Sequence, residues 1–227
     1  AAKAASLGAL AIDINFGCPA KTVNRHRGGA ALLKEPELIH RIVLAVRNAV
    51  PSEVPVSAKI RLGTDDASEM AENVAAIAQA GSSWLTIHGR TKAQGYRPPV
   101  DWHAIADARR YANGMTIIAN GDVHSKVAAE MCQQITGCNT LMIGRAAVSQ
   151  PGLVEEIISG RESLSWAAVR QAQLKFLAEM NGQDVRMVGR YKQWLAMTAL
   201  HYPEAAADFA LIKRLKHRQA VFDTMAL

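Results

Sequence analysis

The sequence predicts an α/β fold: a (β/α)8 barrel of the TIM type, with only about five of its strands present, followed by a small all-helical domain. Three observations support this prediction. Five short β-like runs alternate with helical patterns, which is typical of βαβ units and a parallel sheet. Polar residues gather toward the carboxyl end of each run. After about Ser149 the β-like runs stop and only helical patterns remain.

The expected strands lie at residues 11–16, 56–60, 84–88, 116–120 and 140–144. Side chains alternate across a strand, so Ile12 and Ile14 share one face while Asp13 and Asn15 share the other. Helices packed on the apolar faces would make the polar faces converge, as at the rim of a barrel. In an open doubly wound sheet, helices cover both faces and inward polarity is harder to place. We therefore expect a barrel.

The expected helices between the strands begin and end at recognisable residues. Pro36 stands in the first turn of one, and Gly81 and Gly137 follow the last turns of two others. Three further helical patterns cover residues 163–180, 188–202 and 204–226. Residues 161–227 hold ten Lys and Arg against six Asp and Glu, so this segment carries most of the net charge of +6. We place a boundary near Gly160, with barrel residues 1–160 and helical residues 161–227.

Composition limits the classes of protein that this chain can belong to. The 227 residues are 49% apolar, as in globular proteins, and the mild basic excess permits a polyanionic partner. The cysteines (Cys18, Cys132 and Cys138) are odd in number and form no CxxC pair, so we expect a reducing compartment and neither a disulfide framework nor a bound metal. No apolar run reaches the roughly 18 residues of a membrane span. The chain starts without Met and in mid-pattern, so we expect an excerpt of a longer protein.

Chemistry-bearing residues stand at successive strand ends: Cys18, Lys59, His88 and Asn120. Unpaired charge at a barrel rim costs several kcal/mol on the order given for buried charges, so we expect a ligand there. Two alternatives stay open at this point. Lys59 could pair with Asp13 or Asp122, and His88 could belong to a capped strand end.

The last two strand-to-helix loops resemble anion sites. One contains Asn120, Gly121 and Asp122, and the other contains Gly144 and Arg145. In barrels this location commonly holds a phosphate, and an arginine adds a bidentate partner. The alternative for Gly144 is an ordinary tight turn.

Five motifs, in order across residues 5–150, resemble the tRNA-dihydrouridine synthase family: "NFGCPAK…GGAALL", "AKIRLG", "TIHGRTKAQGY", "IIANGDV" and "LMIGRAA". The later stretches "GRYKQWLAMTALHYPEA" and "FALIKRLK" resemble its bacterial DusC-like subfamily. The resemblance implies an FMN-dependent barrel and a helical tRNA-binding domain. It also implies NADPH-dependent reduction of the C5–C6 double bond of a D-loop uridine, at position 16 in DusC-like members.

The resemblance assigns roles residue by residue. Cys18 matches the catalytic cysteine. The flavin-binding positions match Lys59, His88, Asn120, Gly121, Asp122, Gly144 and Arg145. Positions near the tRNA match Asn15, Arg61 and Tyr96 in the barrel, and Arg190, Lys192 and Lys213 in the helical domain. It also leads us to expect a cytoplasmic monomer.

One departure from the family pattern is large. The strand-end Pro-Met near the family's start and the Gln ending its third strand are absent, so the chain resembles an N-terminally truncated member that holds the last five strands. A barrel without three strands has two open edges.

The expected mechanism uses Cys18 as a general acid, because a thiol with a pKa near 8.5 is mostly protonated at neutral pH. Lys59 would offset negative charge on reduced flavin. A basic run would face RNA phosphates (Lys21, Arg25, His26 and Arg27), and aromatic residues could stack on bases (Tyr96, Tyr191 and Trp194). Nearby cations favour a thiolate, so a nucleophilic Cys18 is an alternative.

Three other functions compete with this one. They are an FMN barrel oxidoreductase acting on a small molecule, a Schiff-base aldolase using Lys59, and a non-catalytic tRNA-binding fragment.

Overall fold

The computed structural model describes residues 1–225 as two compact units. Unit 1 comprises Ala1–Val123 and Val127–Met142, and unit 2 comprises His124–Lys126 and the described residues from Ile143 onward. Each unit is described below by itself.

Unit 1 is built on a five-stranded parallel sheet. Its strands are β1 (Ile12–Asn15), β2 (Val56–Arg61), β3 (Trp84–His88), β4 (Thr116–Asn120) and β5 (Leu141–Met142). Their spatial order is the same as their order in the chain. A doubly wound sheet reverses direction at a switch point, whereas this sheet does not. The arrangement is that of consecutive βα units of a (β/α) barrel, so the expected fold class is confirmed.

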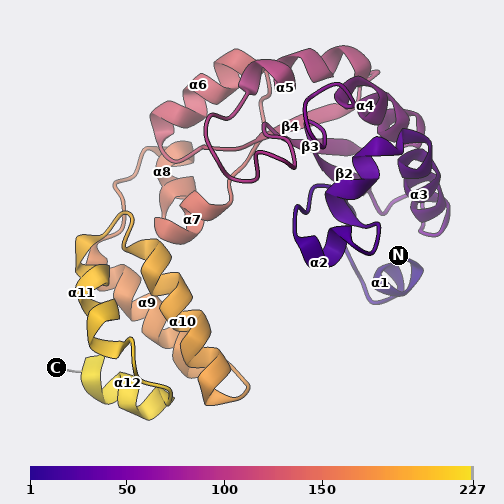
Figure 1. Cartoon of the computed structure of the whole chain (residues 1–227). Coiled ribbons are helices and arrows are strands. Elements are labelled where there is room, and N and C mark those ends of the chain that lie inside the picture. Colours follow the sequence, from indigo (N-terminus) through magenta and orange to yellow (C-terminus); the bar gives the residue numbers. More distant parts are fainter. Residues whose placement is uncertain (226–227) are drawn as a thin grey trace. The chain divides into compact units, whose positions relative to one another are not determined.

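The helices of unit 1 lie between the strands in sequence. The longer ones are α3 (Pro36–Asn48), α4 (Met70–Gln79), α5 (Trp102–Ala108) and α6 (Lys126–Thr136), and they line the outer side of the curved sheet in Figure 1. Short turns of helix complete the unit: α1 (Ala2–Ser6), α2 (Lys21–Asn24), η1 (Gly29–Lys34) and η2 (Arg109–Tyr111). Pro36 is the first residue of α3, as expected, because proline lacks the N–H that the first turn leaves unpaired.

Burial differs between the centre and the edges of the sheet. In β2 every residue except Lys59 is buried, and in β3 all but Trp84 are buried. In β1, Ile12 and Ile14 are half-buried while Asp13 and Asn15 are exposed. The edge strand β1 therefore keeps its polar face open, and the apolar core lies between the central strands and the helices.

Unit 2 is helical. It contains α7 (Arg145–Ser149), α8 (Leu153–Ser159), α9 (Trp166–Glu179), α10 (Asp184–Thr198), α11 (Pro203–Ile212) and α12 (Arg218–Met225). Its core includes Val169, Leu177, Tyr191, Leu195 and Ile212. The Trp194 Nε1 group on α10 donates a hydrogen bond of 3.0 Å to the Val148 carbonyl on α7, so the helices before residue 160 pack with those after it. A functional boundary near Gly160 stays a prediction.

The helix expected over 204–226 is wrong in one respect, because it is two helices: α11 ends at Ile212 and α12 begins at Arg218. Lys192 Nζ donates to the carbonyls of Lys213 (2.8 Å) and Leu215 (2.5 Å), which satisfies carbonyls at the end of α11. Asp184 accepts hydrogen bonds from Arg218 N and Nε at the start of α12. These partners are more than twenty residues away, so the local pattern does not show the break. The expected last residue, 226, lies outside the described residues.

Three findings concern the composition-based expectations. All three cysteines are free thiols. In the part of the chain that the structure describes, no helix has both the length and the apolar character needed to cross a membrane. Within residues 1–225 no cluster of three or more His, Cys, Asp or Glu side chains could hold a metal ion.

Candidate active site

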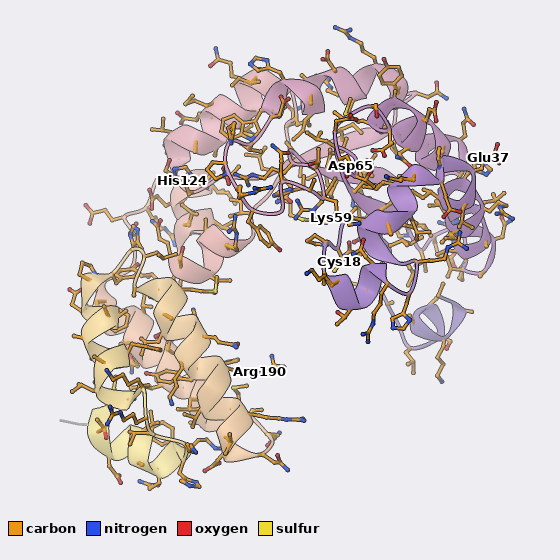
Figure 2. All side chains as sticks on the ribbon, viewed as in Figure 1. Cys18, Glu37, Lys59, Asp65, His124 and Arg190 are labelled. Atoms are coloured by element: carbon orange, nitrogen blue, oxygen red, sulfur yellow. The ribbon has the colours of Figure 1, made fainter. Side chains whose placement is uncertain are left out.

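The strand ends of unit 1 form two rows of neighbouring side chains. Parallel pairing sets Arg61 of β2 beside His88 of β3, and His88 beside Asn120 of β4. One row lower, Asn15 of β1 is the partner of Lys59. All five stand at alternate positions of their strands and hence on the same sheet face. Figure 2 labels Lys59 at this end of β2, and Cys18 in the loop that follows β1.

The loop carrying Cys18 is held at consecutive residues. Asn15 Oδ1 accepts a hydrogen bond from Gly17 N at 2.9 Å, and Arg61 Nε donates to the Gly17 carbonyl at 2.9 Å. The Cys18 carbonyl accepts from Asn24 Nδ2 (2.8 Å) and from Ala30 N (3.0 Å). The backbone of Cys18 is therefore fixed on both sides, while its thiol side chain is only half-buried.

The loop carrying Cys18 is followed by two glycines, and the backbone conformation of the second, Gly29, requires a glycine. Its φ is +59°, a conformation that non-glycine residues adopt at a cost, and a Cβ atom there would lie 2.7 Å from the Cys18 carbonyl oxygen. Only glycine allows η1 to approach the Cys18 loop this closely.

Arg61 joins this loop to the one after β3. Its side chain is buried, and Nη1 donates to the carbonyls of Thr91 (3.0 Å) and Gly95 (2.7 Å). The guanidinium also lies 5.5 Å from the ring centroid of Tyr96, which is 58% exposed. The resemblance places both of these residues near tRNA; Tyr96 is exposed, whereas Arg61 is buried and already donates three hydrogen bonds.

Lys59 is a cation without a carboxylate partner. No ion pair to it occurs among the described residues, because Asp13 accepts from Ser57 Oγ at 2.7 Å and Asp122 pairs with Arg90. The alternative in which Lys59 pairs with either aspartate is therefore wrong. Burial lowers the pKa of Lys59 to about 8; nearby Arg61 adds to the shift and Asp13 opposes it. A partly desolvated ammonium of this kind favours an anionic ligand.

His88 is held neutral at the same rim. Burial, followed by the charges of Arg61, Lys59 and Arg90, lowers the pKa of His88 to about 3. Its Nδ1 atom is buried without a hydrogen-bond partner, as is the Thr86 hydroxyl. Buried polar atoms normally find a partner, so these two atoms and the Lys59 ammonium fit a polar, electron-rich ligand above the strand ends.

The loop after β4 has an unusual backbone. Gly121 has a φ of +125° and Asp122 a φ of +53°. Asn120 Nδ2 donates to the Met142 carbonyl at 2.7 Å, which ties β4 to β5. The Asp122 carboxylate accepts two hydrogen bonds from Arg90, at 3.0 and 2.5 Å. The expected site residues Asn120, Gly121 and Asp122 thus form one braced loop beside His88.

The remaining predicted site residues lie in unit 2. Gly144 and Arg145 stand at the start of α7 and are exposed, and a Cβ at Gly144 would meet nothing within 4 Å. Arg190, labelled in Figure 2, and Lys213 are exposed. Lys192, in contrast, has its ammonium on the carbonyls at the end of α11, and burial lowers its pKa. The structure gives Lys192 a structural contact that the sequence did not indicate.

Two aromatic residues of unit 2 were considered as stacking partners for a base, and only one of them is ruled out. Tyr191 is fully buried in the helical core, so the expectation that it stacks on a base is wrong. Trp194 is half-buried and meets the ring of Phe176 edge-on, with centroids 5.2 Å apart.

Some of the basic residues that follow Cys18 already contact other side chains of the protein. Lys21 and Arg25 are exposed, and Arg25 Nε donates to His26 Nε2 at 3.1 Å. Arg27 pairs with Glu35 at 2.9 Å.

Sequence reasoning missed Asn24 and Arg90. Neither residue was given a role in the sequence analysis, although Asn24 holds the Cys18 carbonyl and Arg90 holds the Asp122 carboxylate. The side chain of Arg90 is only 1% exposed. The only local signal was the position of Arg90 two residues after the end of a strand.

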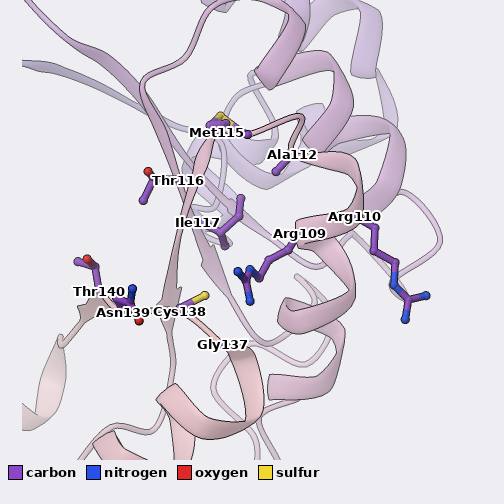
Figure 3. Close-up of a pocket in the computed structure, with 11 residues that line it drawn as sticks. Arg109, Arg110, Ala112, Met115, Thr116, Ile117, Gly137, Cys138, Asn139 and Thr140 are labelled. Atoms are coloured by element: carbon purple, nitrogen blue, oxygen red, sulfur yellow. The ribbon is translucent and has the colours of Figure 1, made fainter.

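A pocket of about 510 Å³ lies away from these residues, at the amino ends of β4 and β5 (Figure 3). Its lining includes Arg109, Met115, Thr116, Cys138 and Asn139. Because the strand-end side chains described above stand at the carboxyl ends, this pocket is not part of the candidate site.

Comparisons with known proteins agree with one another. The family model described as "Dihydrouridine synthase (Dus)" matches residues 1–220. The tRNA-dihydrouridine(16) synthase of Aquipseudomonas alcaligenes is 43% identical over 234 residues, covering 100% of this chain and 74% of the relative. The protein of the same name from Shewanella oneidensis is 43% identical, and the match covers 97% of this chain and 70% of the relative. The protein of that name from Escherichia coli K12 is 41% identical, and the match covers 96% of this chain and 70% of the relative.

Proposed function

We propose that this chain, which belongs to the dihydrouridine synthase family, reduces the C5–C6 double bond of a uridine in tRNA. The relatives named above are tRNA-dihydrouridine(16) synthases, and on that basis the uridine at position 16 of the D-loop is the proposed target. One observation of the structure carries the proposal. A thiol on a braced loop and an unpaired, partly buried ammonium share the carboxyl end of one parallel sheet.

FMN is the proposed cofactor and NADPH the proposed reductant. Bound reduced FMN would supply the hydride that uracil C6 receives. The chain's own contribution is an electropositive rim: Lys59 can offset negative charge on the flavin ring, and neutral His88 offers an unpartnered ring nitrogen. The loop Asn120–Asp122 of unit 1 is proposed to contact the flavin. Gly144 and Arg145 of unit 2 are proposed as flavin contacts on the family resemblance alone.

Cys18 is the proposed general acid. Reduction of C5–C6 adds a hydride at C6 and a proton at C5, and the thiol can donate that proton, leaving a thiolate that water reprotonates. The hydrogen bonds to Gly17 and Cys18 hold the backbone, so the thiol keeps one position relative to the rim. Asn15 and Arg61 hold this loop, and contact with the uridine is a further proposed role for both.

The tRNA is proposed to meet exposed cations and Tyr96. Arg190 and Lys213 are the proposed phosphate contacts of unit 2, because both are exposed. Lys192 is a weaker candidate, since its ammonium already binds two carbonyls. We also propose a monomer in the cytoplasm, the compartment that holds the tRNA.

Replacement of Cys18 tests the proposal. Cys18→Ala in the full-length protein should retain flavin absorbance but lose dihydrouridine formation by on the order of 10²-fold or more, as is typical of a general acid. Cys132→Ala and Cys138→Ala are matched controls, because both thiols are buried away from the strand ends and should affect only packing. Near-normal turnover by Cys18→Ala would refute its assignment. Purified unmodified protein without flavin absorbance, and unable to take up FMN, would refute the function itself.

A further inference from the structure

Arg90 is a buried cation to which neither the family motifs nor the proposed mechanism gives a role. It directly follows the strand-end pair His88-Gly89, and its side chain is only 1% exposed. The guanidinium makes a two-bond contact with the Asp122 carboxylate, and Nε donates to the Arg97 carbonyl at 2.7 Å. A buried charge is tolerated only when it is well paired, and here all three nitrogens of the guanidinium donate a hydrogen bond.

The contacts of Arg90 connect the loops that follow β2, β3 and β4. Leu62 N, just after β2, donates to the Arg90 carbonyl at 3.2 Å. Arg97 belongs to the loop after β3, and Asp122 to the loop after β4. The same residue therefore sets the spacing of these loops at the catalytic end of the sheet.

The loop after β4 needs such a contact. Asp122 has a left-handed φ of +53°, a conformation that residues other than glycine adopt infrequently. The preceding Gly121 also has a positive φ, of +125°. Glycine adopts a positive φ without steric cost, so Asp122 is the residue whose conformation depends on its contacts, and the planar fork of Arg90 on the Asp122 carboxylate holds it in place.

The negative charge of Asp122 is a second reason why the loop after β4 depends on Arg90. Asp122 is part of the loop proposed to contact flavin, yet a free carboxylate there would repel an anionic phosphate. The ion pair with Arg90 compensates that charge.

We propose that Arg90 is a positioning residue for the phosphate end of the flavin: it fixes the Asn120–Asp122 loop and neutralises Asp122, so that this loop can accept an anion. This inference rests on the proposed flavin binding. It predicts that loss of Arg90 weakens binding of FMN but spares riboflavin, which has the same ring system and no phosphate. A salt bridge that served only stability would change both affinities alike.

The experiment compares FMN and riboflavin affinities of flavin-free full-length protein, measured by quenching of flavin fluorescence, with thermal unfolding followed in parallel. In Arg90→Gln the dissociation constant for FMN should rise about tenfold or more, as for loss of hydrogen bonds to a charged group. That for riboflavin should stay within about twofold. Arg90→Lys keeps the charge but not the fork and should show a smaller loss of the same kind; it also decides the matter if Arg90→Gln does not fold.

Arg47→Gln is the matched control. Arg47 also donates to several carbonyls, those of Val50, Pro51 and Val54, but these precede β2 at the opposite end of the strand. Its replacement should lower thermal stability without changing the ratio of the two affinities. An unchanged FMN-to-riboflavin ratio in both Arg90 variants would overturn the inference while leaving the proposed function intact. Unmodified protein that binds neither flavin would overturn both.

Discussion

Replacing Gly29 by alanine should displace the Cys18 loop. An alanine Cβ would lie 2.7 Å from the Cys18 carbonyl oxygen, 3.0 Å from Cys18 Cβ and 3.1 Å from Val23 Cγ1. The oxygen contact is shorter than any Cβ normally makes, and the two Cys18 atoms are its backbone carbonyl oxygen and the Cβ atom that bears the thiol. Relief of the clash therefore requires the Cys18 loop or η1 to move.

The expected loss of stability has two parts. The left-handed φ of +59° costs an alanine about 1–2 kcal/mol, and overpacking adds about 1–3 kcal/mol. Together these give about 2–5 kcal/mol, which most domains survive with a reduced margin. A shift of the thiol by about 1 Å can lower turnover by about 10²-fold, because a general acid must stay within hydrogen-bond reach of its target.

The assay is dihydrouridine formation in single turnover with saturating tRNA and flavin-loaded protein, alongside urea unfolding. Gly114→Ala is the control, because Gly114 has a φ of +82° but a Cβ there would meet nothing within 4 Å. It should cost only the conformational part of the stability and leave turnover unchanged. If Gly29→Ala turned over as fast as Gly114→Ala, the tight packing of η1 on the Cys18 loop could not be what positions the thiol.

Two further predictions concern cofactor and tRNA. Because the pKa of Lys59 is lowered to about 8, its ammonium is present below that pH and lost above it, so FMN affinity should fall as pH rises through about 8. Lys59→Met should abolish this dependence in a fluorescence titration, and a flat profile in unmodified protein would contradict the assignment. Arg190→Ala and Lys213→Ala should each reduce the salt dependence of tRNA binding by a slope of about 0.7–0.9, whereas Lys192→Ala should mainly lower thermal stability. Unaltered slopes in Arg190→Ala and Lys213→Ala would show that these residues do not contact phosphates.

The sequence predicts the periodic parts of the fold because their signal is local. Short β-like runs indicated all five strands, and Pro36 and Gly137 lie where the corresponding helices begin and end. The polar faces of the strands favoured a barrel over a doubly wound sheet, and the sequential strand order agrees. The family motifs likewise occupy contiguous stretches of chain, so the family could be recognised before any contact was known.

The sequence could not predict how individual polar side chains are paired. By residue type, Lys192 could contact RNA, but its ammonium binds carbonyls at the end of α11. By residue type, Tyr191 could stack on a base, but it lies in the core. Both outcomes depend on which helix face meets which neighbour, and that is decided by packing of segments about twenty or more residues apart. The same holds for the predicted helix over 204–226, which is interrupted by contacts with α10.

The sequence by itself determined the α/β class, the positions of the strands and the set of residues that could carry chemistry, because these follow from periodicity and short motifs. Only the tertiary structure decided the partners within that set. Arg61 reaches Gly17, 44 residues earlier, and Arg90 reaches Asp122, 32 residues later, because parallel pairing brings the carboxyl ends of consecutive strands to one edge. The tertiary contacts also decide which charged residues are paired. Asp122 is neutralised by Arg90, and Lys59 is left as the unpaired cation of the rim.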